Sequence, residues 1–320
     1  ILIGLVGSEM CIRDRYSCDE VAGDLELRYF NIDRDKQSII PFIRAAQKYN
    51  PELTFWTSPW CPPSWMKITG DYPVLSSKFN HMPEKMNYIL YGNVNDKVDP
   101  DEMKLVGRRG DKFPRQLATT DYFIQDPRYL QAYANYFCKF IDAYKEQGVN
   151  IDMVIYQNEA YSYTPYPGCA WTAEGTVRFN RDYLGPTLRQ KHPEVKLYLG
   201  TFNTNRVDYV QKIASDTKLQ EYVSGMAFQW EGRESLPVLR KEHPEWNYMC
   251  SESECGRGSF DWGAGEHTFE LMNHYLGNGC NEYTFWNFIL ADNGESPWGW
   301  KQNAPVSYTH LRAHETDQYL

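Results

Sequence analysis

The sequence lacks several features that mark other classes of protein. No run of apolar residues is long enough to cross a bilayer, so no transmembrane segment is expected. Its charges form no long run of one sign, and with a net charge of -9 and a pI near 5.4 a nucleic-acid partner is not expected. The 8 cysteines form no C-x-x-C pair and no Cys/His ligand spacing, which argues against a metal site.

Aromatic residues, in contrast, are abundant. They make up 15% of the chain, with 24 Tyr and 10 Trp. Carbohydrate-binding clefts use such rings as stacking surfaces, and an aromatic-rich core is the alternative. At 320 residues the chain is long enough for one barrel-sized domain.

The two ends of the chain are related at the level of nucleic acid. Residues 7–14, written as the codons GGC TCG GAG ATG TGT ATA AGA GAC, have a reverse complement that translates as residues 306–313. Folding imposes no such relation, and the segments resemble a sequencing adapter read into a reading frame. We therefore predict that residues 1–15 and 306–320 are non-native and that 16–305 form the catalytic domain.

Strand-like and helix-like segments alternate along the chain. The strand-like segments are 53–57, 151–156, 196–200, 223–229, 246–250 and 283–288. The helical segments are 35–49, 126–147, 173–191, 207–212, 234–242 and 266–276. Residues 16–19 are interpreted as the end of a further strand, and about 71–123 as one long irregular connection. This alternation predicts parallel βα units and an α/β fold.

Two strand-like segments deliver a glutamate at their carboxyl ends. Val154–Tyr156 leads into Gln157, Asn158 and Glu159. The segment 246–250 leads into Ser251–Gly256, which contains Glu252 and Glu254. In a parallel barrel these ends meet at the mouth, where two carboxylates can serve glycoside hydrolysis as proton donor and nucleophile. The alternative for each glutamate alone is a solvated residue at a strand end.

Aromatic and acidic residues in neighbouring loops are candidates for binding sugar. The loop Ser58–Lys67 contains three prolines that fix its backbone and two tryptophans, of which Trp60 is a candidate ring platform. A purely structural role for the tryptophans is the alternative. Asp19 lies where a strand-end carboxylate could meet a sugar hydroxyl, or it is a turn residue.

Four motifs in order resemble glycoside hydrolase family 30, especially its glucosylceramidase branch. They are SPWCPPSWMK at 58–67, QNE at 157–159, SE with Cys-Gly at 251–256, and FWN at 285–287. The resemblance implies a TIM (β/α)8-type barrel with the acid/base after the fourth strand and the nucleophile after the seventh. It also implies that this barrel is incomplete at its N-terminus and that a companion β-sandwich is missing.

The resemblance assigns roles residue by residue. Glu159 is similar to the acid/base, and Asn158 to the neighbour that holds the sugar 2-hydroxyl. Glu252 matches the nucleophile because it directly follows Ser251, with Glu254 as the rival.

Four further residues complete the predicted binding site. Asp19 and Trp60 match residues that grip the glycone, Trp286 matches the wall of its pocket, and Trp230 is another substrate-binding candidate. The chain departs from the family pattern at Ala160, where proline is common, and at 229–231, where Gln-Trp-Glu stands for His-Trp-Tyr.

These residues predict a retaining β-glycosidase that hydrolyses β-glucosides by double displacement and needs no cofactor. An endo-β-1,6-glucanase or a xylan-cleaving relative is the alternative within the enzymes. A catalytically inactive carbohydrate-binding protein is the alternative of another class. A further hypothesis is that the chain itself is inactive because an incomplete barrel leaves strand edges exposed. Relatives of this kind are commonly secreted, periplasmic or lysosomal, which gives the expected location.

Overall fold

The computed structural model describes residues 15–76, 80, 82–83, 120–164, 166–254, 256, 258–259, 261–286 and 303. Most of the long connection predicted between residues 71 and 123 lies outside this part. So do both predicted non-native ends, apart from Arg15. The described residues form no β-sandwich.

Six parallel strands form one curled sheet in the described part. The strands are β1 (Trp56–Thr57), β2 (Met153–Ile155), β3 (Lys196–Phe202), β4 (Val223–Gln229), β5 (Asn247–Ser253) and β6 (Glu282–Phe285). They pair in the order β1-β2-β3-β4-β5-β6, and every neighbouring pair is parallel. This topology is that of an incomplete (β/α) barrel and confirms the predicted fold class.

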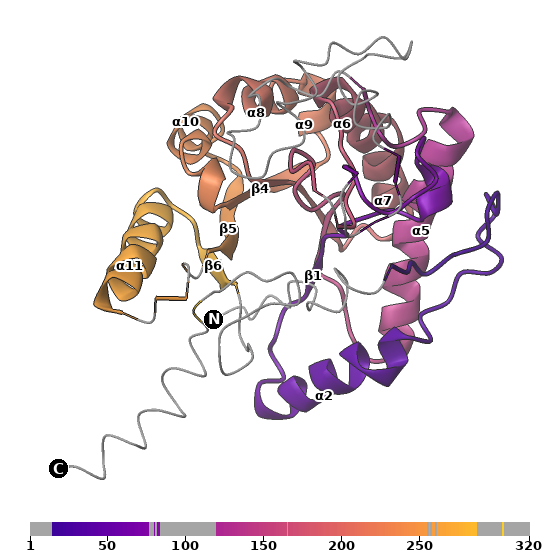
Figure 1. Ribbon diagram of the computed structural model, residues 1–320, viewed down its shortest axis with the longest axis horizontal. Coiled ribbons are helices and arrows are strands. Elements are labelled where there is room, and N and C mark those ends of the chain that lie inside the picture. The colour runs from indigo at the N-terminus through magenta and orange to yellow at the C-terminus, as the bar shows by residue number, and fades with distance from the viewer. Residues whose placement is uncertain are drawn as a thin grey trace.

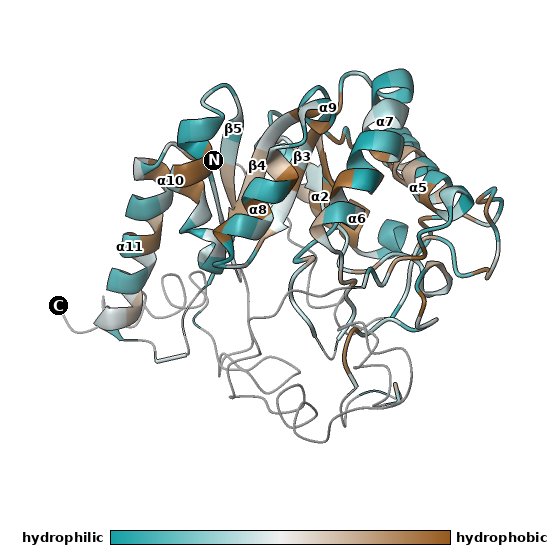
Figure 2. Cartoon of the chain, turned by 90° about the horizontal axis from the view of Figure 1, so that it is seen from above, coloured by the Kyte–Doolittle hydropathy of each residue, from teal (hydrophilic) through white to brown (hydrophobic). Residues whose placement is uncertain are grey.

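Helices alternate with the strands along the chain and cover the outer face of the sheet. They are α2 (Ile39–Tyr49), α5 (Pro127–Glu146), α6 (Ala173–Phe179), α7 (Gly185–Lys191), α8 (Val207–Ala214), α9 (Thr217–Gln220), α10 (Ser235–Glu242) and α11 (Trp262–Gly277). Figure 1 shows them around the strands, with α2 and α11 at the two ends of the curve. Hydrophilic residues of α6 and α8 face outward in Figure 2. None of the described helices is both long and apolar enough to span a membrane.

Alternate residues of the strands face the inside and the outside of the curl. Met153, Ile155, Tyr198, Ala227 and Met249 form a small buried cluster. Their strand neighbours belong to the larger clusters that the helices complete, as Val154 does. The apolar runs of these strands are therefore buried on both faces, as is usual in a parallel sheet.

Two predicted elements, the strand end at 16–19 and the helix 173–191, differ from the structure. Residues 16–19 do not form a strand, because the backbone of Cys18 bonds to the Tyr136 hydroxyl (2.8 Å) and to the Asn31 N–H (2.8 Å). The predicted helix 173–191 is interrupted by a π-helical turn, η3 (Asn180–Leu184). Pro186 follows and has no N–H to continue the α-helical ladder.

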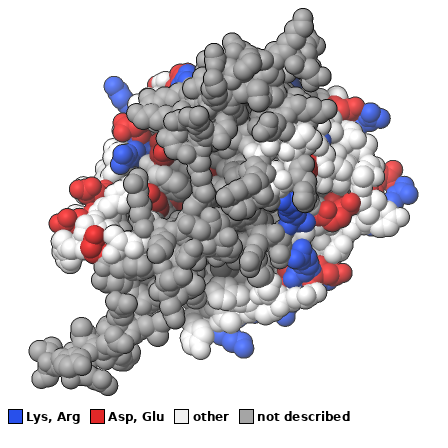
Figure 3. Space-filling model, viewed as in Figure 1, with Lys and Arg blue, Asp and Glu red and all other residues white. Residues whose placement is uncertain are grey.

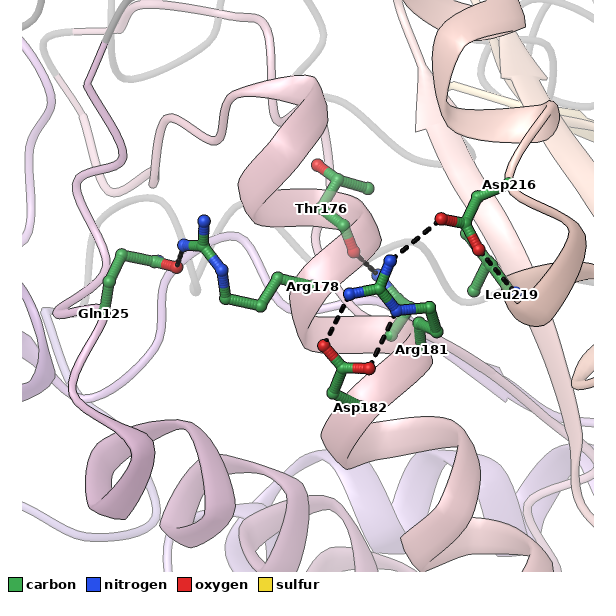
Figure 4. Close-up of polar contacts among 8 residues, drawn as sticks. Gln125, Thr176, Arg178, Arg181, Asp182, Asp216 and Leu219 are labelled. Atoms are coloured by element: carbon green, nitrogen blue, oxygen red, sulfur yellow. Dashed lines mark hydrogen bonds and ion pairs between the residues drawn. The ribbon is translucent and has the colours of Figure 1, made fainter.

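The short helix α9, whose N-cap is Asp216, has no counterpart among the predicted helices. The Asp216 side chain accepts from Leu219 N (2.8 Å), while its other oxygen pairs with Arg181 of η3 (2.9 Å). Arg181 also binds Asp182 through two bonds of 2.7 Å (Figure 4). At the edge of the face drawn in Figure 3, basic and acidic side chains also lie side by side.

Candidate active site

Glu159 lies just beyond the carboxyl end of β2 and is buried, with 5% exposure. Its backbone is in the left-handed region, with φ at 48°, which few non-glycine residues adopt. Neighbouring strands hold this turn from both sides. Asn158 N donates to Pro59 O after β1 (2.8 Å), and Glu159 N donates to Thr201 Oγ1 in β3 (3.1 Å).

Glu252 lies inside β5 and is 3% exposed. In the sheet register it is paired with Gln229 at the end of β4, and Gln229 Nε2 donates to Glu252 Oε2 at 3.3 Å. Glu159 and Glu252 thus belong to strands three places apart. This is the separation expected between the fourth and seventh strands of the barrel.

Burial and like charges shift the ionisation of both carboxyl groups. Burial raises the pKa of Glu159 to about 7, against hydrogen bonds from Ser162 and Asn203 that lower it. Burial, and then the charge of Glu159, raise the pKa of Glu252 well above its ordinary value. Because two like charges in a buried site resist simultaneous ionisation, the pair is expected to retain a proton near neutral pH.

Thr201 orients the side chain of Asn158. The Thr201 hydroxyl accepts from Glu159 N and from Gln229 Nε2 (2.9 Å), so its single proton goes to Asn158 Oδ1 (2.7 Å). Gln229 Nε2 also donates to Asn158 Oδ1, at 3.0 Å. Asn158 therefore presents Nδ2, which is buried and has no hydrogen-bond partner among the described residues. A buried donor without a partner is ready to bind a ligand oxygen.

Trp60 lies in the loop after β1, against the loop after β2. Its carbonyl accepts from Gln157 Nε2 (2.7 Å), and its ring meets that of Tyr166 edge-on at 5.4 Å between centroids. Trp60 is buried, and its indole Nε1 has no partner in the described part of the chain.

Lys67, at the end of the same motif, joins these two loops. Its ammonium group is buried and donates to the carbonyls of Tyr72 (2.7 Å), Pro73 (3.1 Å) and Gly168 (2.7 Å). The loops also share backbone hydrogen bonds from Val74 N and Leu75 N to Thr164 O. The loops after β1 and β2, which lie beside Glu159, are therefore held together by polar contacts as well as by packing.

Asp19 is buried, and burial raises its pKa to about 6. Its Oδ1 accepts from Val21 N (3.1 Å), its carbonyl accepts from Trp65 Nε1 (3.0 Å), and its Oδ2 is buried without a partner among the described residues. No hydrogen bond within the described part joins Asp19 to either glutamate. Its predicted place in the site stays a prediction.

Trp230 and Trp286, the other two tryptophans predicted to bind substrate, directly follow β4 and β6, the two strands that flank β5. Trp230 begins the 3-10 turn η4 (Trp230–Gly232) directly after β4 and is half-buried. Trp286 directly follows β6, and its backbone N–H donates to Ser253 O (3.1 Å), next to Glu252. The strand order therefore places both beside the end of β5.

Glu254, the rival of Glu252, has a different environment. It is about one-third exposed and contacts His267 of α11, with 2.5 Å between Oε1 and Nε2. Only Glu252 of the two is buried next to Gln229. Within the described ranges, no three His, Cys, Asp or Glu residues converge in the manner of a metal site.

Sequence reasoning did not assign Thr201, Asn203 or Gln229 to the site. All three lie at the carboxyl ends of β3 and β4, the strands between those that carry the glutamates. A polar residue at each strand end was the available signal, but the same pattern also occurs at ordinary solvated strand ends.

Comparisons with known proteins agree with this architecture. The family model described as the glycosyl hydrolase family 30 TIM-barrel domain matches residues 3–78 and 123–313. Lysosomal acid glucosylceramidase of Mus musculus is 26% identical over 307 residues, which are 88% of this chain and 50% of that protein. An endo-1,6-beta-D-glucanase of Aspergillus fumigatus is 25% identical over 216 residues, 67% of this chain and 37% of that protein.

The fold resembles solved structures of similar architecture. SrfJ from Salmonella typhimurium superposes with a TM-score of 0.67 at 20% identity, over 91% of this chain and 57% of that one. The chain spans about half the length, or less, of these two curated relatives.

Proposed function

Because the chain belongs to glycosyl hydrolase family 30, we propose that it hydrolyses β-glycosides with retention of configuration, Glu252 acting as nucleophile and Glu159 as acid/base. One observation carries this proposal. Two buried glutamates lie at the carboxyl ends of strands three places apart, and the charge of one raises the pKa of the other. Such a pair can hold one proton and one negative charge, as the first step of a retaining mechanism requires.

In the first step Glu252 attacks the anomeric carbon while Glu159 donates its proton to the leaving oxygen. The glycosidic C–O bond breaks, and the glycosyl group becomes an ester of Glu252. In the second step Glu159, now ionised, removes a proton from water, which displaces Glu252. This chemistry needs a carboxyl separation of roughly 5 Å, since an inverting pair leaves room for a water molecule.

The glycone is proposed to bind among Asp19, Trp60, Asn158, Trp230 and Trp286. Asn158 Nδ2, Asp19 Oδ2 and Trp60 Nε1 are buried without partners among the described residues, so a ligand with several hydroxyl groups could satisfy all three. The tryptophans offer apolar faces to the sugar ring.

We propose β-glucosides as the substrates, with a glucosylceramidase-like preference. The similarity to the mouse lysosomal acid glucosylceramidase supports this choice and also a lysosomal location. A secreted or periplasmic location is proposed beside it, as the family resemblance implies. The similarity to the Aspergillus endo-1,6-beta-D-glucanase supports the second candidate, cleavage of β-1,6-glucan. A xylan-cleaving activity and an inactive carbohydrate-binding protein remain alternatives that the same assay separates.

The test is hydrolysis of aryl β-glucosides, glucosylceramide, β-1,6-glucan and xylan by the wild-type chain, Glu159→Ala and Glu252→Ala. Sodium azide is then added to the variants with an activated aryl glucoside. Azide should restore turnover of Glu252→Ala to the α-glucosyl azide and of Glu159→Ala to the β-glucosyl azide, because it replaces the nucleophile in one and water in the other. Folded wild-type chain that binds sugars but cleaves no substrate would favour the carbohydrate-binding protein. If Glu252→Ala gave the β-glucosyl azide and Glu159→Ala the α-glucosyl azide, Glu159 would be the nucleophile and Glu252 the acid/base.

A further inference from the structure

Asn203, directly after β3, connects Glu159 to the segment after β4. Its Nδ2 donates to Glu159 Oε1 at 3.2 Å, and its Oδ1 accepts from Glu231 N at 3.1 Å. Because a backbone N–H can only donate, it fixes the orientation of the Asn203 amide. A flipped amide would place Nδ2 against the N–H of Glu231 and lose both bonds.

We propose that Asn203 is a positioning residue that determines which oxygen of Glu159 carries the catalytic proton. This inference rests on the proposed function of Glu159 as acid/base. Since Oε1 accepts from Asn203, the proton of the neutral carboxyl group resides on Oε2. During cleavage it passes from Oε2 to the leaving oxygen as the C–O bond breaks, and a proton from water returns to Oε2 in the second step.

The acidic groups around Glu159 explain why the position of its proton needs to be fixed. Glu252 faces it from β5, and Glu231 adds a like charge from η4 that raises its pKa. Hydrogen bonds from Asn203 and Ser162 oppose that effect by favouring the ionised form. Asn203 therefore both directs the proton and keeps Glu159 acidic enough to release it.

Two variants test the proposal. Asn203→Leu removes the donor, and Asn203→Asp keeps an acceptor for Glu231 N but offers Glu159 a second acceptor, which draws the proton away from the substrate. Asn205→Leu is the matched control, because Asn205 is an exposed residue of the same loop. The readouts are kcat/KM for a series of aryl β-glucosides, from good to poor leaving groups, and its pH profile.

Proton donation matters most for poor leaving groups. We expect Asn203→Leu to lower kcat/KM for phenyl β-glucoside by about 10²-fold, to leave the dinitrophenyl substrate close to wild type, and to move the alkaline limb to higher pH. Asn203→Asp should show the same dependence on the leaving group, whereas Asn205→Leu should follow wild type.

Equal losses on all substrates, or an unchanged pH profile, would mean that Asn203 is merely structural and would overturn the proposal. Glu159→Gln separates this failure from that of the proposed function. If Glu159→Gln depends on the leaving group and Asn203→Leu does not, the Asn203 proposal alone fails. If Glu159→Gln shows no such dependence, the acid/base role itself is wrong.

Discussion

Gln229 and Glu252 are direct neighbours in the register of β4 and β5, and the Gln229 amide donates to the Glu252 carboxylate at 3.3 Å. The same Nε2 lies 2.9 Å from Thr201 Oγ1 and 3.0 Å from Asn158 Oδ1, so its two protons are shared among three acceptors. One neutral side chain thus joins the proposed nucleophile to the residue proposed to hold the sugar 2-hydroxyl. The Tyr275 hydroxyl donates to the carbonyl of Gln229 and fixes its backbone.

Replacing Gln229 with leucine should therefore impair catalysis. Loss of one preorganised donor to a reacting carboxylate is expected to lower kcat/KM by about 10²-fold. Gln211→Leu on the exposed side of α8 is the matched control and should retain wild-type activity. A Gln229→Leu variant within a few-fold of wild type would show that this hydrogen bond does not assist the nucleophile.

Glu252 and Glu254 should respond differently to the same substitution. Glu252→Gln removes the buried carboxylate and should reduce kcat by more than 10⁴-fold on aryl glucosides, a loss typical of a residue that carries the reaction. Glu254→Gln removes only the partially exposed partner of His267 and should stay within about tenfold of wild type. The reverse result would transfer the nucleophile to Glu254.

The raised pKa of Glu159 predicts how stability depends on pH. Because its pKa rises from 4.5 to about 7 on folding, its ionisation opposes folding. The neutral carboxyl group of Glu159 is compatible with the fold, so the stability that it allows is fully present below pH 4.5. That stability is lost as the pH rises through about 7 and the group ionises. Glu159→Gln should therefore gain stability relative to wild type across that interval, measured by urea unfolding at several pH values.

An exposed control separates this effect from general ones. Glu52→Gln should follow the wild-type pH dependence, since Glu52 lies on the surface. If the difference between wild type and Glu159→Gln did not change with pH, Glu159 would not have the ionisation described here.

Lys67 should be required for stability of the loops beside Glu159. Lys67→Met removes the donor to the buried carbonyls of Pro73 and Gly168, each at a cost of about 1 kcal/mol or more, while the Tyr72 carbonyl keeps the Gly168 N–H as a donor. The free energy of unfolding should therefore fall by about 2 kcal/mol. Lys36→Met is the control, because the Lys36 ammonium group forms an exposed pair with Asp33, and its change should be within about 0.5 kcal/mol. Equal effects of the two substitutions would contradict the role of Lys67.

The parallel sheet could be predicted from the sequence because each strand is a short apolar run followed by polar residues. The residues 223–229 match β4 in full. The predicted strand 53–57 is reduced to Trp56–Thr57, since the Asp152 side chain binds Phe55 N (2.8 Å) where ladder pairing would otherwise start. A contact between residues so distant in sequence leaves no local signal.

The candidate site was predictable in part for the same reason. Glu159 and Glu252 stand out because an apolar strand ends in a carboxylate within a motif. Asn203 and Thr201 do not, because their importance depends on a network across β2, β3 and β4. The orientation of Asn158 likewise follows from counting donors and acceptors among residues that only the fold brings together.

Covalent trapping tests the central claim most directly. The wild-type chain is incubated with dinitrophenyl 2-deoxy-2-fluoro-β-glucoside, which slows both steps of a retaining mechanism but has a leaving group good enough to form the ester. Mass spectrometry of the intact chain and of its peptides then locates the adduct. We predict one fluoroglucosyl group, attached to Glu252. An adduct on any other residue, or hydrolysis of the parent glucoside to the α-anomer without a trapped ester, would contradict the two-glutamate retaining mechanism.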